Sequence, residues 1–283
     1  MVLVVAAQVC LNQMEYKRLD VLKNTLELVM EDIQSKRENE ESCLVIFPEL
    51  IGSWMILCDQ PFSYSSRYSI LTMIWLILKR PIKFIKLLCN NVYYRNLNHT
   101  LSGMFTRTLF QLESERMLNH YYSIFHDLSK KYKSWIVAGS SYLPRLDLDS
   151  SNKPQILSNH ELSLYNTSLT FNCKGEIVNI TYKTKPVLEE LEFIDSGSIS
   201  DLKSIHATNI GNIGVLICAD SWYPECLEKM KVDENSNEKL IIAVPTFISP
   251  LEKYKKPWNG YSGSKTPSFA LGDVGRISEK EAS

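Results

Sequence analysis

The sequence has no long apolar run, little glycine and proline, and no excess of positive charge. No apolar stretch reaches the ~18 residues that a membrane-spanning helix needs, so we expect none. Eleven Gly and eleven Pro in 283 residues exclude collagen-like and proline-rich sequences. Lys and Arg number 31 and Asp and Glu 32. This balance excludes a generally basic surface, so we expect no nucleic-acid partner.

Cysteine usage and the start of the chain indicate the compartment. Seven cysteines are too few for a small disulfide-stapled scaffold, and their number is odd. The opening MVLVVAAQVCLNQ has no basic segment before its apolar run, and the polar Gln8 soon follows. This pattern predicts a buried strand rather than a signal peptide. We therefore expect a cytoplasmic protein with reduced thiols.

One further absence is local. From Gln60 to Leu112 the chain has no Asp or Glu but holds seven Lys and Arg, whereas the remainder has 24 basic and 32 acidic residues. The block contains the apolar run ILTMIWLIL, then Lys79-Arg80 and the mixed run IKFIKLL. It is interpreted either as a helical pair packed on the core or as a basic amphipathic segment. In the second case, residues 70–95 would make a peripheral contact with an anionic membrane surface.

Alternating strand and helix patterns predict an α/β fold. Short apolar or alternating runs predict strands at 2–7, 43–47, 135–138, 166–172, 176–182, 213–218 and 239–245. The strands at 166–172 and 176–182 are expected to form a hairpin. Apolar residues at helical spacing predict helices over 19–33, 111–133 and 223–230. The polar segment 144–160 is expected to be a loop.

Reactive side chains follow three of the predicted strands. Glu49 follows CLVIFP, Lys183 and Lys185 follow EIVNITY, and Cys218 ends IGVLIC. Ligand sites in α/β sheets gather at the carboxyl ends of strands, so these side chains can meet. A base, a cation and a thiol together suit attack on a carbonyl or nitrile carbon. Taken singly, each residue also fits a structural role as a loop carboxylate, a surface lysine or a core cysteine.

Several segments resemble, in chain order, motifs of the carbon–nitrogen hydrolase (nitrilase) superfamily. GVLICADSWYPE resembles its nucleophile motif, FPEL its general-base motif and NTSLTFNCKGEIVNITYKTK the hairpin that leads to its lysine. IVAGS and KLIIAVPT also fit, so the resemblance covers 1–54 and 134–250. It implies a four-layer α-β-β-α sandwich, a homo-oligomer, and chemistry without a metal or organic cofactor.

The resemblance also implies roles for individual residues. Glu49, Lys183 and Cys218 correspond to the family's triad, which cleaves a small-molecule amide through a thioester on the cysteine. The backbone N–H of Ala219 would help Lys183 to bind the oxyanion. Lys185 remains an alternative to Lys183, because both follow the same strand.

The residues around the triad bear on the substrate. The family often has a second, substrate-side glutamate, for which Glu189, Glu190 and Glu192 compete and Glu190 is preferred. The Ala-Asp pair after the cysteine resembles amidase-type branches more than nitrile-hydrolysing ones, which tend to have Trp-Glu there. Trp222 and Tyr223 are expected either to contact the substrate or to be core aromatics.

Two other interpretations of the function stay open at this level. One is a Cys–His hydrolase with His160 or His206 as the base. The other is a catalytically silent family member that binds a membrane or a protein. In either case 1–283 is expected to form a single domain, with 60–112 as an insertion near the active-site mouth. The part after Pro250 is shorter than the family pattern suggests.

Overall fold

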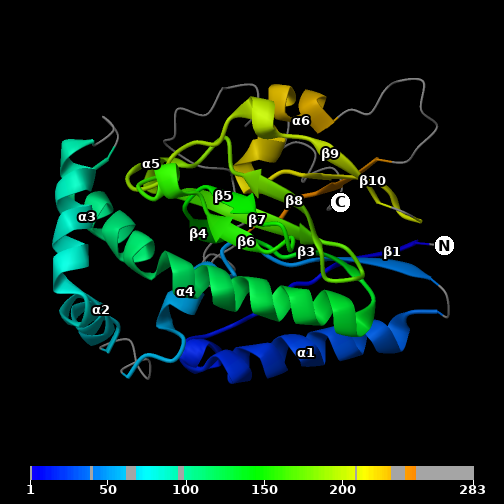
Figure 1. The fold of residues 1–283 in the computed structure, drawn as a ribbon. Coiled ribbons are helices and arrows are strands. Elements are labelled where there is room, and N and C mark those ends of the chain that lie inside the picture. Colours follow the sequence, from blue (N-terminus) through cyan, green and yellow to red (C-terminus); the bar gives the residue numbers. More distant parts are fainter. Residues whose placement is uncertain are drawn as a thin grey trace, which may run out of the picture.

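The computed structural model is an α/β protein, shown as a ribbon in Figure 1. It describes residues 2–38, 41–61, 68–94, 99–207, 209–230 and 240–246. The strands are β1 (Val2–Ala6), β2 (Ser42–Ile46), β3 (Trp135–Val137), β4 (Ser141–Leu143), β5 (Leu146–Leu148), β6 (Pro154–Ile156), β7 (Tyr165–Phe171), β8 (Ile177–Tyr182), β9 (Ser204–Ala207), β10 (Gly211–Val215) and β11 (Leu240–Ala243). The α-helices are α1 (Leu19–Lys36), α2 (Tyr68–Lys79), α3 (Pro81–Tyr93), α4 (Leu101–Tyr132), α5 (Leu188–Leu191) and α6 (Pro224–Met230). Short 3-10 turns are η1 (Glu15–Lys17), η2 (Ser53–Leu57), η3 (Ser158–His160), η4 (Ile199–Asp201) and η5 (Cys218–Trp222).

The strands form a larger and a smaller sheet. In the larger sheet the order is β1-β2-β3-β7-β4, and β8 also pairs with β7. β1, β2 and β3 run parallel, whereas β7 is antiparallel to β3, β4 and β8. The smaller sheet has the order β11-β10-β9, with β10 parallel to β11 and antiparallel to β9. β5 and β6 form a separate small hairpin.

The two sheets pack against each other through one face of each. Leu44 of β2 and Val137 of β3 share a buried cluster with Ile213 and Val215 of β10. Because side chains alternate along a strand, the intervening residues point to the opposite faces, where helices cover them. Most of both sheets is therefore buried, which explains why β1, β3 and β11 are continuous apolar runs.

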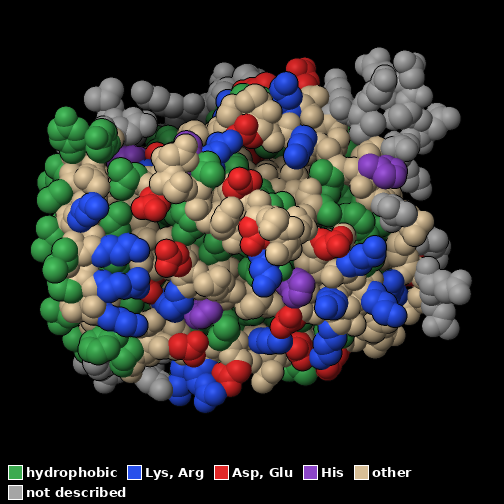
Figure 2. Space-filling view, viewed as in Figure 1, with side chains coloured by type: hydrophobic (Ala, Val, Ile, Leu, Met, Phe, Trp, Pro, Cys, Tyr) green, Lys and Arg blue, Asp and Glu red, His purple; other side chains and the backbone are tan. Residues whose placement is uncertain are grey.

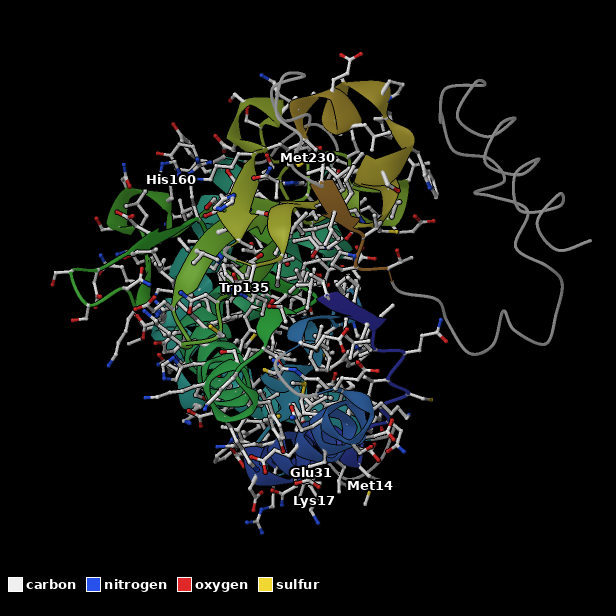
Figure 3. The ribbon with its side chains drawn as sticks, turned by 90° about the vertical axis from the view of Figure 1, so that its right-hand side faces the viewer. Met14, Lys17, Glu31, Trp135, His160 and Met230 are labelled. Carbon is white, nitrogen blue, oxygen red and sulfur yellow. The ribbon has the colours of Figure 1, made fainter. Side chains whose placement is uncertain are left out.

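Helices cover the outer faces of the two sheets. Val45 packs with buried side chains of α1 and α4 on the larger sheet, and Met230 of α6 packs with Leu216 on the smaller one. Figure 3 shows these layers, with Met230 and Glu31 at opposite ends of the molecule and Trp135 of β3 between them. The predicted α-β-β-α sandwich is confirmed.

The predicted strands, the β7–β8 hairpin and helices α1 and α6 are confirmed, but two other expectations are wrong. The segment 144–160, expected to be a loop, contains β5 and β6, whose partly exposed residues lack an apolar pattern. The helix expected from residue 111 begins at Leu101. Its first turns bury polar side chains such as Arg107 and Thr108, which hide the helical apolar stripe. β4, β9 and α5 were not predicted from the sequence.

The acid-free block 60–112 comprises α2, α3 and the first turns of α4. α3 packs on α4 through Phe84, Leu87, Leu109 and Leu112. Within the described residues, none of the helices is long and apolar enough to cross a membrane. The part after Pro250, expected to be short, lies outside the described residues.

Gly139 allows the ends of β2 and β3 to meet. It has a φ of +68°, and a Cβ there would lie 2.0 Å from the carbonyl oxygen of Pro48. The adjoining Ser140 accepts hydrogen bonds from the N–H groups of Leu50 (2.9 Å, on Oγ) and Gly52 (2.9 Å, on the carbonyl). The loop that carries Glu49 is thereby fastened to the end of β3.

We predict that Gly139→Ala lowers the free energy of unfolding by roughly 2–4 kcal/mol, because it adds both a backbone clash and an unfavourable φ. Urea unfolding followed by circular dichroism measures this. Gly214→Ala is the matched control, since its Cβ would meet the flexible end of Met230 at 2.7 Å and not a backbone atom. An equal loss in both variants would contradict the prediction.

Candidate active site

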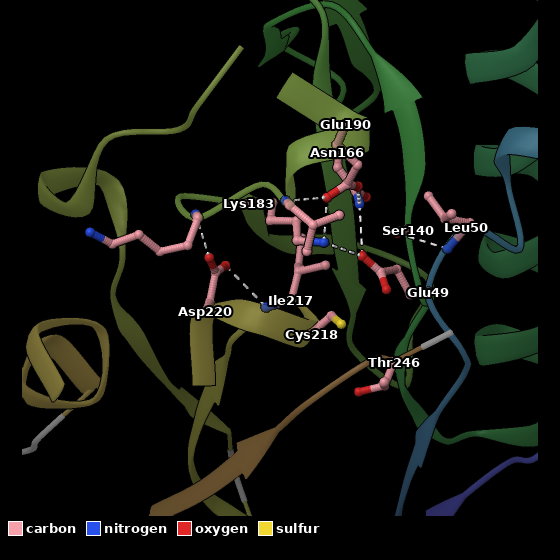
Figure 4. A network of polar contacts seen from close by, with 12 residues as sticks. Glu49, Leu50, Ser140, Asn166, Lys183, Glu190, Ile217, Cys218, Asp220 and Thr246 are labelled. Atoms are coloured by element: carbon pink, nitrogen blue, oxygen red, sulfur yellow. Dashed lines mark hydrogen bonds and ion pairs between the residues drawn. The ribbon is translucent and has the colours of Figure 1, made fainter. Parts of the chain in front are cut away.

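Glu49, Lys183 and Cys218 come from three distant parts of the chain and meet in one buried cluster (Figure 4). Glu49 lies three residues after β2, Lys183 directly follows β8, and Cys218 begins η5 just beyond β10. β2 and β8 belong to the larger sheet and β10 to the smaller one. The packing of the two sheets therefore assembles the cluster.

The ammonium group of Lys183 lies between two carboxylates. Its Nζ is 2.7 Å from Oε1 of Glu49 and 2.6 Å from Oε2 of Glu190 in α5. Burial by itself would lower the pKa of Lys183, but the nearby negative charges of Glu49 and Glu190 raise it above its usual range. Lys183 is therefore a permanent buried cation.

Glu49 has the electrostatics of a proton acceptor. Burial raises its pKa from the ordinary glutamate value, and the opposing effect of Lys183 is smaller. The neighbouring thiol of Cys218 lowers the pKa of this carboxyl group only to a smaller extent. A carboxylate with a raised pKa beside a thiol can take up the proton of that thiol.

Asn166 of β7 is a functional candidate that the sequence interpretation missed. Its Nδ2 donates to Oε1 of Glu49 (2.9 Å) and to Oε1 of Glu190 (2.8 Å), so the two acceptors define the orientation of the amide. Its carbonyl accepts from the N–H of Lys183 at 2.8 Å. Tyr142 adds a 3.3 Å hydrogen bond to Glu190. Local pattern gave little signal, because Asn166 is one of several polar residues in β7, with Thr167, Ser168 and Thr170.

Cys218 sits on a strained turn. Its φ is +50°, a left-handed conformation that is uncommon for a residue with a side chain and often marks a functional site. The N–H of Cys218 donates to the carbonyl of Pro245 (2.9 Å), and Ser221 Oγ donates to the carbonyl of Cys218 (2.8 Å). These bonds fix the backbone of the turn, and Figure 4 shows the thiol of Cys218 on the side of Glu49.

Asp220 ties this turn to the lysine segment. Its Oδ1 accepts from the N–H (3.0 Å) and hydroxyl (2.9 Å) of Thr184 and from the N–H of Lys185 (2.7 Å), and its Oδ2 accepts from the N–H of Ile217 (3.2 Å). The carboxylate is fully buried. It positions Cys218 relative to Lys183 through the backbone.

The competing residues point elsewhere. The Nζ of Lys185 pairs with Glu225 at 2.8 Å and lies over the ring of Tyr223, away from Glu49. Glu189 is exposed, and Glu192 accepts a 3.1 Å hydrogen bond from Thr100. The structure thus brings Lys183 and Glu190 into the cluster, and not their sequence neighbours.

The other residues expected near a substrate differ in position. Ala219 is buried beside Cys218 in η5. Tyr223 packs against the buried apolar side chains under α6, such as Leu216 and Met230, as expected for a core aromatic residue. Trp222 is half-buried at the end of η5. Of the three, only Ala219 adjoins the thiol directly.

The histidines considered as bases lie outside the cluster. His160 ends η3 near the edge of the molecule in Figure 3, and His206 is exposed on β9. In the part of the chain that the structure describes, no group of three or more His, Cys, Asp or Glu side chains is arranged to hold a metal ion.

Comparison with known protein families identifies the relationship. The family model for carbon-nitrogen hydrolases matches residues 6–258, which is nearly the whole chain. The chain belongs to the carbon-nitrogen hydrolase family. The described part of the matched region includes Glu49, Lys183 and Cys218, and the resemblance that their motifs suggested is confirmed at the level of the family. No curated protein matches the sequence significantly.

Solved structures with a similar arrangement come from the same superfamily. A carbon-nitrogen hydrolase from Helicobacter pylori is 17% identical, with 85% of this chain and 58% of that chain covered and a TM-score of 0.46. Saccharomyces cerevisiae Nit3, of branch 10 of the nitrilase superfamily, is 17% identical, with 83% and 60% covered and a TM-score of 0.38. An amidase variant from Nesterenkonia sp. AN1 is 10% identical, with 81% and 63% covered and a TM-score of 0.40. The matches thus span less than two thirds of the length of these structures.

Asp220 gives a testable pH dependence. Burial raises its pKa to about 6, although hydrogen bonds from the Lys185 N–H and from Thr184 lower it. In the unfolded chain the pKa is lower, so between about pH 4 and pH 6 the folded state binds more protons than the unfolded state. The stabilising contribution is complete below this window and is lost as the pH rises through it.

We predict that, as the pH rises through this window, the free energy of unfolding falls by up to about 3 kcal/mol more in the wild type than in Asp220→Asn. Urea unfolding at a series of pH values measures the difference. Exposed Asp147→Asn is the control and should follow the wild-type profile. Parallel profiles for the wild type and Asp220→Asn would contradict the assignment of this pH dependence to Asp220.

Proposed function

We propose that the protein hydrolyses a linear amide of a small molecule through a covalent thioester on Cys218. The observation that carries the proposal is that one buried carboxyl group, Glu49, binds the ammonium group of Lys183 at 2.7 Å and lies beside the thiol of Cys218 (Figure 4). Glu49 is the general base and acid, and Lys183 is the oxyanion-binding cation. Membership of the carbon-nitrogen hydrolase family supports these roles.

The first half of the reaction forms the thioester. Glu49 takes the proton from the thiol of Cys218, and the thiolate sulfur attacks the amide carbon. The oxygen of the tetrahedral intermediate carries a negative charge, which Lys183 and the N–H of Ala219 stabilise. Among the described residues, that N–H has no hydrogen-bond acceptor. The C–N bond then breaks, and Glu49 passes its proton to the departing amine or ammonia.

The second half releases the acid. Glu49, ionised again, removes a proton from a water molecule, whose oxygen attacks the thioester carbon. The C–S bond breaks, and the proton on Glu49 returns to the sulfur of Cys218. The net reaction converts an amide and water to a carboxylic acid and an amine or ammonia, and the enzyme is regenerated.

Glu190 and Asn166 position the ammonium group of Lys183 and the carboxylate of Glu49. With Lys183 held between two carboxylates, its ammonium group cannot swing away when the substrate enters. Asn166 binds both carboxylates from one amide nitrogen: it donates to Oε1 of Glu49, which also accepts from Lys183, and to Oε1 of Glu190, whose Oε2 accepts from Lys183. Such preorganised charges lower the barrier because they need no rearrangement in the transition state.

The chemical class follows from the residues after the nucleophile. Ala219-Asp220 resembles the amidase-type pattern, and Asp220 is committed to backbone N–H groups of the turn. It is therefore a structural residue and not a second acid for nitrile hydrolysis. The buried position of the cluster fits a small substrate better than a protein chain.

We predict that Cys218→Ala lowers ammonia release by at least about 10³-fold, since no other nucleophile can form the thioester. An ammonia-release screen over small amides, ω-amides, carbamoyl compounds and nitriles finds the working substrate, and the variants are then compared on it. Cys10→Ala, at an exposed cysteine, is the matched control and should retain wild-type activity. Unchanged turnover in Cys218→Ala would refute the mechanism, and no turnover on any member of the screen would favour a catalytically silent protein.

The two lysines give a second prediction. Lys183→Met should reduce kcat/KM by roughly 10³-fold or more, because the oxyanion loses its buried cation. Lys185→Met removes a partly exposed ion pair with Glu225 and a contact with the ring of Tyr223, both outside the cluster, so its activity should stay within about threefold of wild type. Circular dichroism shows whether each variant is folded. A larger loss in Lys185→Met than in Lys183→Met would reverse the assignment.

A further inference from the structure

Helices α2 and α3 present an apolar surface to the solvent. Its central residues are at least two-fifths exposed, and we call them the α2–α3 apolar face: Leu71, Ile74, Leu78, Ile82, Ile85 and Val92. Figure 2 shows this face as a continuous band of hydrophobic side chains along one edge of the molecule. Contiguous apolar surface on this scale usually marks an interaction site and not ordinary surface variation.

The apolar face is a distinct side of α3. Phe84 and Leu87 point to α4 and are buried, whereas Ile82 and Ile85 point away from it, and Ile82 is 83% exposed. α3 therefore has two apolar sides, of which only one is needed for packing within the fold. The second side remains uncovered by any described part of the chain.

Lysines border the apolar face without acidic partners. Lys83 and Lys86 are three residues apart on α3, and Lys79 ends α2. Among the described residues, none of the three has a carboxylate within ion-pair distance. Figure 2 shows basic side chains in a column beside the hydrophobic band. The surface thus joins apolar and positively charged groups.

The arginines of the same block are used differently. Arg80 bonds to the buried Glu113, and Arg107 pairs with Asp195 at 2.6 Å. The fold therefore neutralises these two guanidinium groups internally and leaves the lysines on the outside. The positive charge of the surface is not a by-product of the helix packing.

We propose that the α2–α3 apolar face is a docking surface for an anionic lipid bilayer. An apolar helix face with flanking lysines lies in the plane of a membrane, with its side chains among the acyl chains and its ammonium groups at the phosphates. At 12 and 13 residues, α2 and α3 are about 20 Å long, too short to cross the hydrocarbon layer. Trp75 and Tyr93, both exposed, are of the types enriched at the membrane interface.

Charge favours a bilayer over a second copy of the chain. A two-fold contact places the same surface on both partners, so the lysines of one copy would approach those of the other. The block 60–112 contains no Asp or Glu to pair with them. An anionic bilayer instead supplies the missing negative charge over the whole surface.

The experiment is vesicle co-sedimentation of the full chain. The probes are vesicles of phosphatidylcholine alone and vesicles with about 30% phosphatidylserine. We expect binding to the anionic vesicles at about 0.1 M salt, reduced tenfold or more at about 0.5 M, where screening is stronger. No binding to anionic vesicles at low salt would overturn the proposal.

A charge-matched pair of variants tests the lysines. The triple variant Lys79→Gln, Lys83→Gln, Lys86→Gln should lose about 100-fold in partitioning, since each lysine near an anionic surface contributes roughly fivefold. The control removes three exposed lysines elsewhere and should stay within about threefold of wild type. These control substitutions are Lys153→Gln, Lys174→Gln and Lys203→Gln. Equal losses in the two triple variants would overturn the assignment to this face.

A second matched pair tests the apolar face. Leu78 and Leu28 are 67% and 66% exposed, on α2 and α1. Leu78→Glu should weaken binding at least about tenfold, and Leu28→Glu should not, because only Leu78 is on the docking surface. Light scattering is run in parallel. A dimer that Ile82→Glu dissociates, without vesicle binding by the wild type, would assign the face to a second copy and refute membrane docking.

Discussion

The cluster depends on one buried ammonium group held between two buried carboxylates. Each of these charges would be costly to bury alone, so Lys183, Glu49 and Glu190 are stable in the interior only together. They come from the ends of β2 and β8 and from α5, so their pairing demands that these segments meet. The same ion pairing that offsets the cost of burying these side chains also places a carboxyl group beside the thiol.

A framework of backbone hydrogen bonds holds the thiol in place. Asp220 accepts hydrogen bonds from the N–H of Lys185, which follows β8, and from the N–H of Ile217, which follows β10. It therefore links the two sheets near the cluster. Gly139 permits the close approach of the loop with Glu49 on the other side. With these supports, Cys218 can be held in a strained left-handed conformation. Strain at the nucleophile is thus balanced by bonds that contribute nothing to the chemistry themselves.

Much of the fold was predictable because β1, β3 and β11 are short continuous apolar runs and β7 and β8 form a hairpin around a recognisable turn. The start of α4 was not predictable, since Arg107 and Thr108 are buried there by contacts with distant segments. Nor could composition show which positive charges of the acid-free block stay exposed. Arg80 and Arg107 find carboxylates inside the molecule, and the lysines do not.

The sequence by itself determined the family and the positions of Glu49 and Cys218, because strand ends are recognisable from local pattern. It could not separate Lys183 from Lys185, since both follow the same strand. The tertiary structure decided this: the N–H of Lys183 still pairs with Asn166, which continues the β7–β8 pairing and turns its side chain inward. Lys185 lies past that pairing and turns outward to a surface carboxylate. Asn166 itself became visible only in the structure, because a bridge between two carboxylates is a property of three segments and not of one.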